Sequence, residues 1–208
     1  MIAARPSRLT GKRVFDILAA GVGIVLTAPL QAGVAVVIAR RLGRPVLFIQ
    51  PRPGQHGRVF SLVKFRTMLP VDQARGLVSD ADRMTRFGSV LRSTSLDELP
   101  TLWNVLRGDM SMVGPRPLLV KYLSLYSERQ ARRHEVRPGV TGLAQVRGRN
   151  AISWEDKLEW DVRYVETRTF LGDMRILGAT LGAVLARRGV TARGSATTSE
   201  FVGTGGTS

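Results

Sequence analysis

The stretch that decides the fold class is V-F-D-I-L-A-A-G-V-G-I-V-L-T-A-P-L-Q-A-G-V-A-V-V-I-A, from Val14 to Ala39, in which Asp16 is the single charged residue. A helix needs about 20 apolar residues to cross the hydrocarbon core of a bilayer, and this run exceeds that length. A buried helix of a soluble protein seldom stays uncharged for so long. A signal peptide has a shorter apolar run that ends in an A-x-A site. The sequence therefore predicts a membrane segment over residues 14–39.

Basic residues flank this segment on both sides. They are Arg5, Arg8, Lys12 and Arg13 before it and Arg40, Arg41 and Arg44 after it. Because basic flanks prefer the cytoplasmic side, a hairpin that dips into the membrane and returns suits both clusters, whereas a straight span suits one. Pro29 removes a helical hydrogen bond near the middle and favours a kink, and Thr27 is placed to satisfy a freed carbonyl. A kinked, re-entrant helix is favoured, with a simple span as the alternative.

The composition indicates one basic domain of ordinary size. The chain has 208 residues and a formal net charge of +15. Such an excess of positive charge predicts an acidic partner: nucleic acid, an anionic membrane surface or a phosphorylated substrate. The lack of cysteine excludes disulfides, thiolate metal sites and a cysteine nucleophile. The two histidines, His56 and His134, are too few for a histidine-rich metal site.

Beyond the membrane segment, the pattern predicts an α+β fold that is mostly helical. Two stretches rich in β-branched and aromatic residues, 44–50 and 58–68, flank a turn-like P-R-P-G-Q-H-G segment and indicate a short β-hairpin. Apolar residues at helical spacing predict helices at 154–165 and 174–188. The final residues, 191–208, are rich in Gly, Ser and Thr and predict a loose tail.

Four further stretches place charged side chains among Gly and Pro residues. They are K-F-R-T-M (64–68), L-R-S-T-S-L-D-E-L-P (91–100), G-D-M-S-M-V-G-P-R-P (108–117) and R-P-G-V-T-G-L-A-Q-V-R-G-R-N (137–150). Together with K-R-x-x-D at 12–16, these stretches in this order resemble the small monotopic polyprenyl-phosphate phosphoglycosyl transferases of the bacterial sugar transferase family, in particular the PglC-type members. The resemblance extends from about Lys12 to about Phe201.

This resemblance implies transfer of a phosphosugar from a UDP-sugar to undecaprenyl phosphate, with release of UMP, as the first membrane step of glycoconjugate biosynthesis. It also implies Mg²⁺ as cofactor, a covalent phosphosugar on an aspartate, and a re-entrant anchor. Two positions depart from the family pattern: Ala28-Pro29 stands where members often carry Ser-Pro, and L-P-T-L (99–102) replaces L-P-Q-L. The PglC-type likeness favours an N-acetylated sugar, with a bacillosamine derivative as one candidate.

The resemblance also implies where the protein lies and how it is divided. The expected location is the cytoplasmic face of the bacterial inner membrane, with membrane lipids as partners, no nucleic acid, and a homodimer left open. We expect monotopic insertion, with helices lying at the membrane surface. The expected divisions are a basic flank (1–13), a re-entrant membrane helix (14–39), a catalytic domain (40–190) and the loose tail (191–208).

Asp97 and Glu98 form the acidic pair of the second stretch. Taken alone, they read as first-turn acids favoured by the helix dipole. Ser95 with Glu98 matches a capping box, and Asp97 as N-cap with Pro100 in the first turn matches equally well. In the family context Asp97 becomes the nucleophile, kept ionised by a helix N-terminus, and Glu98 the Mg²⁺ ligand or organiser of the site. Both carboxylates are candidate metal ligands.

A carboxylate that attacks a diphosphate needs cations to offset the repulsion between anions. The candidates for this phosphate site are Lys64, Arg92, Arg116 and Arg149. Arg116 is the strongest by local chemistry because Pro115 and Pro117 restrict its backbone. Asp161 joins the set from a matching family stretch.

Three classes of function compete. An enzyme of this family accounts for the acidic pair, the arginines and the apolar segment together. A nucleic-acid binder accounts for the charge, but it leaves residues 14–39 unexplained, and the chain lacks a recognition motif. A membrane-anchored basic scaffold without catalysis is the remaining alternative, and it leaves the Gly- and Pro-rich stretches without a role.

Overall fold

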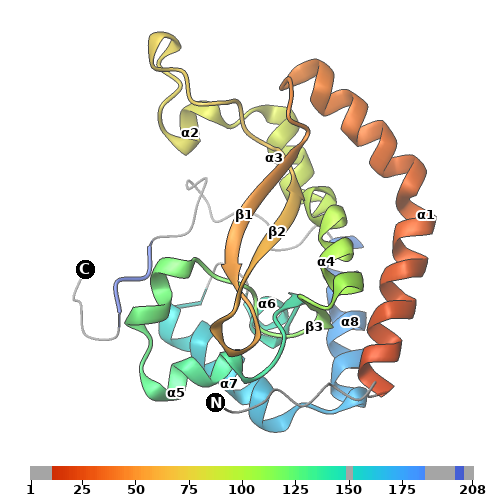
Figure 1. Ribbon diagram of the computed structural model, residues 1–208, viewed down its shortest axis with the longest axis vertical. Coiled ribbons are helices and arrows are strands. Elements are labelled where there is room, and N and C mark those ends of the chain that lie inside the picture. Colours follow the sequence, from red (N-terminus) through yellow and green to blue (C-terminus); the bar gives the residue numbers. More distant parts are fainter. Residues whose placement is uncertain (1–10, 149–151, 186–199, 204–208) are drawn as a thin grey trace.

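The computed structural model describes residues 11–148, 152–185 and 200–203 of the chain. It is mostly helical, and its long N-terminal helix α1 (Gly11–Arg41) runs along one side of a body that contains a β-hairpin (Figure 1). This architecture agrees with the expected α+β class. Gly11 to Arg41 is long and apolar enough to cross a membrane.

Helix α1 continues through Pro29 and curves over the body (Figure 1). Pro29 lacks an N–H, so the carbonyl of Val25 loses its helical donor. Thr27 does not satisfy that carbonyl: its Oγ1 donates to the carbonyl of Gly23 at 2.6 Å. The expectation for Thr27 is thus wrong in its target, because a helical threonine reaches the carbonyls three and four residues back. Back-bonding of this kind also promotes bending.

Both ends of α1 pack against the body, whereas its middle is exposed. Asp16 and Ala20 are buried near the N-terminal end, and Val34 and Ile38 near the C-terminal end. The exposed apolar residues between them are Leu18, Val22, Val25, Leu26 and Leu30. Because water disfavours such a surface, this middle section is the part of α1 suited to lipid.

The K-R-x-x-D motif docks the N-terminal end of α1. Lys12 forms an ion pair with buried Asp173. Arg13 donates to the carbonyls of Val105 and Leu106, at 2.6 and 2.9 Å, in the last turn of helix α4 (Leu102–Arg107). The carboxylate of Asp16 accepts hydrogen bonds from the Ser111 hydroxyl and the Met112 amide, both at 3.0 Å. These bonds join the membrane segment to the body rigidly.

The predicted β-hairpin is confirmed, but residues 51–53, which were expected in the turn, belong to its first strand. Strand β1 (Leu47–Pro53) pairs antiparallel with β2 (Val59–Phe65), and a 3-10 turn, η1 (Gln55–Gly57), connects them. Asn104 of α4 ties this hairpin to the helices: its amide donates to the carbonyl of Ser61 at 2.8 Å and accepts from the amide of Val63 at 3.0 Å.

The sequence did not predict a second sheet, in which β3 (Ser111–Val113) pairs in parallel with β4 (Gly139–Thr141). This pair joins the third and fourth motif stretches. The approach is so close that a Cβ on Gly114 would lie 2.4 Å from the carbonyl oxygen of Arg137, and one on Gly139 would lie 2.1 Å from the amide nitrogen of Gly114. Glycine at both positions is therefore a packing requirement.

Two longer helices complete the body. In α7 (Trp154–Thr167) the predicted apolar stripe is buried, with Leu158 and Val162 fully covered. Helix α8 (Phe170–Leu185) starts four residues before its predicted position. The remaining helical elements are short: η2 (Gln73–Arg75), α2 (Asp80–Arg83), α3 (Arg86–Ser93), η3 (Leu96–Thr101), η4 (Val120–Leu125), α5 (Glu128–Ala131), η5 (Arg132–Glu135) and α6 (Leu143–Arg147).

Part of the expected loose tail is packed. Phe201 is 4% exposed and lies among the rings of Tyr122, Tyr126 and Trp154. The neighbouring Glu200 forms an ion pair with Lys121 at 2.7 Å. The free energy gained by burying one aromatic ring offsets the entropy lost when a short polar segment becomes ordered. Composition alone therefore gave a wrong prediction for residues 200–203.

Candidate active site

The acidic pair lies in η3, where the backbone differs from both expected caps. Ser95 adopts left-handed backbone angles, with φ 56° and ψ 18°, and its side chain makes no capping hydrogen bond. Such a conformation is strained for a residue with a Cβ, and strain of this kind is typical of functional sites. Glu98 does not complete a capping box because its carboxylate is bound to cations from other elements.

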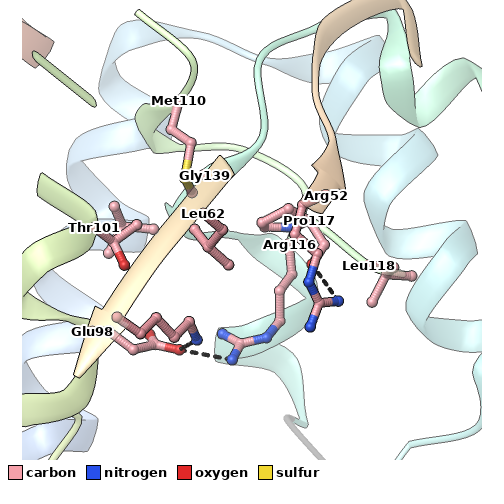
Figure 2. A pocket seen from close by; sticks show the side chains of 11 residues that line it. Arg52, Leu62, Glu98, Thr101, Met110, Arg116, Pro117, Leu118 and Gly139 are labelled. Atoms are coloured by element: carbon pink, nitrogen blue, oxygen red, sulfur yellow. Dashed lines mark hydrogen bonds and ion pairs between the residues drawn. The ribbon is translucent and has the colours of Figure 1, made fainter. Parts of the chain in front are cut away.

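Glu98 joins two of the predicted cations. Its Oε1 lies 2.6 Å from Lys64 Nζ and 2.7 Å from a terminal nitrogen of Arg116 (Figure 2). Burial alone would raise the pKa of Glu98, but the fields and hydrogen bonds of Arg116 and Lys64 hold it well below its usual range. Glu98 is therefore ionised and keeps both cations in place.

Lys64 reaches Glu98 because β2 is bonded to η3 and α4. The hydroxyl of Thr101 donates to the carbonyl of Val63 at 3.1 Å, and Asn104 binds the same strand. Burial lowers the pKa of Lys64, and the adjacent carboxylate of Glu98 opposes that effect. The ion pair with Glu98 therefore favours the protonated amine.

Arg116 is held from behind by a buried ion pair. Arg133 donates to the carbonyl of Arg116 at 2.7 Å, and the same guanidinium binds Asp161 at 2.7 Å. Arg133 and Asp161 are both almost fully buried. The structure thus places Asp161 behind the Arg116 loop, as a partner of Arg133, and not among the side chains that line the pocket.

A small pocket lies over Glu98, Lys64 and Arg116 (Figure 2). Its other polar lining groups include Arg52 of β1 and Thr101 of η3, and its apolar floor includes Leu62 and Met110. The charged lining residues are three cations and one carboxylate, so the pocket carries net positive charge. A phosphate group suits it.

Sequence reasoning missed Arg52, although the signal was present. P-R-P occurs at 51–53 as well as at 115–117, and the restriction that singled out Arg116 applies equally to Arg52. Figure 2 shows the two guanidinium groups side by side in the pocket.

Asp97 is 8% exposed, and its environment differs from the one expected. Burial is the main cause that raises the pKa of Asp97 to about 6, and the negative charge of Glu98 adds to it. Lys64, Arg116 and Arg92 act in the opposite direction. The expectation that a helix N-terminus keeps this carboxyl ionised stays a prediction, and the burial of Asp97 acts against it. Near neutral pH Asp97 is still mostly ionised.

Arg92, another candidate cation, is not among the residues that line the pocket. Arg92 of α3 donates to the hydroxyl of Thr67 at 3.1 Å and lies close enough to Asp97 to lower its pKa. Arg149 falls outside the described residues.

The acidic pair fits a divalent cation that relies on substrate for most of its ligands. No group of three or more carboxylate, histidine or cysteine side chains suited to a metal occurs within the described ranges. Mg²⁺ commonly binds one or two carboxylates plus substrate phosphates. Asp97 and Glu98 are the adjacent carboxylates that could supply such ligands.

Comparison with known proteins decides the family. The family model described as bacterial sugar transferase matches residues 7–187. This chain belongs to the bacterial sugar transferase family. It is a transferase of the kind indicated by its motif stretches, and the fold brings four of those stretches around one pocket.

Several named relatives extend over most of the chain. The "Uncharacterized sugar transferase EpsL" of Bacillus subtilis is 49% identical over 195 residues, which cover 93% of this chain and 96% of that protein. The "UDP-glucose:undecaprenyl-phosphate glucose-1-phosphate transferase" of Caulobacter vibrioides is 41% identical, covering 84% of this chain and 69% of that protein. The "Undecaprenyl-phosphate galactose phosphotransferase" of Salmonella typhimurium is 36% identical and covers 90% of this chain but 43% of that protein.

Proposed function

We propose that this transferase moves a phosphosugar from a UDP-sugar to undecaprenyl phosphate and releases UMP. The observation that carries the proposal is the ion-paired cluster in which Glu98 holds Lys64 and Arg116 at the pocket. The buried carboxylate of Asp97 comes directly before Glu98 in η3, although Asp97 itself does not line the pocket. A nucleophile and two oriented cations are what phosphoryl transfer to a carboxylate needs. The names of the relatives from Caulobacter and Salmonella support the same reaction.

The proposed reaction proceeds in two steps. An oxygen of Asp97 attacks the sugar-bearing phosphorus of the donor, the bond from that phosphorus to the bridging oxygen breaks, and the electron pair leaves with UMP. A phosphate oxygen of undecaprenyl phosphate then attacks the same phosphorus and restores the Asp97 carboxylate. Because the soluble donor and the lipid acceptor use the site in turn, the kinetics are ping-pong.

Lys64 and Arg116 act on the phosphoryl group while it is transferred. Glu98 orients both side chains toward one point, so little reorganisation is needed as negative charge builds up on the phosphate oxygens. Arg116 also offers a planar fork that matches two oxygens at once.

Asp97 and Glu98 would hold Mg²⁺ in this proposal, together with donor phosphates. The ion supplies charge neutralisation and polarisation of the phosphate oxygens.

The membrane segment is proposed to re-enter on the cytoplasmic face, which makes the protein monotopic. The support is packing: Asp16 near one end of α1 and Ile38 near the other are both buried against the same body. A straight span would carry one of these contacts across the bilayer. The exposed apolar middle, around Val25 and Leu26, is then the part that enters lipid.

Labelling tests this topology. The native chain has no cysteine, so Gly11→Cys and Arg40→Cys each give a single thiol, at exposed ends of α1. We expect an impermeant maleimide to label both only from the cytoplasmic face in inverted vesicles. Pro29→Leu should shift labelling of one end to the other face, because the bend loses a cause. If Gly11→Cys and Arg40→Cys, each with Pro29 unchanged, were labelled from opposite faces of the membrane, the re-entrant proposal would be contradicted.

The donor sugar is proposed to be a hexose. The printed names of the Caulobacter and Salmonella relatives specify glucose and galactose, in contrast to the N-acetylated sugar that the PglC-type likeness favours. A panel of UDP-sugars with undecaprenyl phosphate and Mg²⁺, scored by UMP release, tests both the reaction and the sugar. If no donor in the panel released UMP, the alternative of a membrane-anchored basic scaffold without catalysis would be favoured.

A further inference from the structure

Arg52 occupies the pocket without a carboxylate partner. It reaches the pocket from β1, and its side chain donates to the Gln50 side chain at 2.7 Å and to the Pro117 carbonyl at 3.3 Å. Its Nε is buried and makes no hydrogen bond within the described part of the chain. The same part contains no Asp or Glu within ion-pair distance of Arg52. Arg52 is thus fixed by neutral groups only.

The charged side chain that acts on Arg52 is also positive. Burial and, to a smaller extent, the field of Arg116 together lower the pKa of Arg52 to about 10. Two guanidinium groups held side by side repel each other unless an anion lies between them. Arg116 has Glu98 on one side, and Figure 2 shows Arg52 on its other side, away from Glu98.

We infer that Arg52 binds the nucleotide phosphate of the donor, the group that departs as UMP, while Lys64 and Arg116 bind the transferred phosphoryl group. This inference rests on the proposed function and assigns the pocket's two ends to the two phosphates of the donor. Glu98 marks the end where transfer occurs, since it adjoins Asp97 in the chain and holds Lys64 and Arg116. Arg52 marks the other end.

The chemistry at this second end follows from bond cleavage. When the bond between the sugar-bearing phosphorus and the bridging oxygen breaks, that oxygen and its electron pair stay on the nucleotide phosphate. The phosphate of UMP therefore gains negative charge during the first step. A guanidinium fixed by Gln50 and the Pro117 carbonyl is oriented in advance to receive it.

Binding of UMP to the full-length enzyme in nanodiscs tests the inference directly. We expect Arg52→Gln to weaken UMP binding by about tenfold or more in calorimetry, because a charge-assisted bond is lost. The UMP affinity of Arg52→Lys should lie between those of Arg52→Gln and the native protein, since lysine keeps the charge but lacks the planar guanidinium. Arg58→Gln, an exposed arginine of the same hairpin, is the matched control and should bind UMP as the native protein does. Thermal midpoints check that each variant is folded.

Two outcomes would overturn the assignment. One is unchanged UMP affinity in folded Arg52→Gln. The other is a rise in the KM for undecaprenyl phosphate with unchanged UMP affinity, which would place the lipid phosphate at Arg52. Either result, with a native enzyme that still releases UMP from a UDP-sugar, would leave the proposed function standing. A native enzyme that releases no UMP from any UDP-sugar would overturn the proposed function instead. In that case, loss of UMP binding in Arg52→Gln would still show that Arg52 binds a nucleotide phosphate.

Discussion

Asp97→Asn should abolish both the covalent phosphosugar adduct and turnover. The substitution keeps the size of the side chain and removes the nucleophilic oxygen anion, so the loss should reach at least about 10³-fold. Intact-protein mass spectrometry after quenching with UDP-sugar alone is the measurement. The native enzyme should gain the mass of one phosphosugar, mapped to Asp97, and the variant none.

The pH dependence of the adduct provides a second readout on the same residue. The pKa of Asp97 is raised to about 6, so the nucleophilic form is dominant above that pH and is lost as the pH falls through it. Adduct formation by the native enzyme should decline accordingly between about pH 7 and pH 5. An adduct on another residue, or turnover without an adduct, would instead indicate a different nucleophile or direct transfer.

Arg116→Lys should lower kcat/KM by about tenfold or more, which corresponds to about 1.4 kcal/mol of transition-state stabilisation. Lysine keeps the charge and can still approach Glu98, but it loses the planar fork that grips two phosphate oxygens. Steady-state kinetics with the best UDP-sugar of the panel measure the effect.

Arg132→Lys is the matched control for this prediction. Arg132 also binds a carboxylate, that of Glu166 at 2.6 Å, but it is a partly exposed residue of η5 that does not line the pocket. Its substitution should change kcat/KM by less than about twofold. Equal losses in the two variants would mean that Arg116 acts only through general positive charge.

Elements whose signals are local could be predicted from the amino-acid sequence. The run from Val14 to Ala39, in which Asp16 is the single charged residue, has helical length and lipid-like composition, so α1 could be predicted without any partner. The hairpin follows from two stretches rich in β-branched and aromatic residues around a turn-like segment, and the buried stripe of α7 follows from apolar residues at helical spacing. The motif stretches likewise identified the family and drew attention to Asp97, Glu98, Lys64 and Arg116.

The contacts among those residues depend on the tertiary structure. Glu98 contacts Lys64 and Arg116 because Asn104 and Thr101 bind β2, and because the parallel β3–β4 pair fixes the loop that carries Arg116.

Three side chains lie where the sequence did not predict them. Asp161 was expected at the phosphate site but pairs with Arg133 behind the loop that carries Arg116. Arg52 lines the pocket, and Phe201 packs into an aromatic cluster. The physical reason is the same in each case. Periodicity and composition report which face of an element is buried, whereas a contact between residues tens of positions apart depends on close backbone approach and on which buried charge finds a partner.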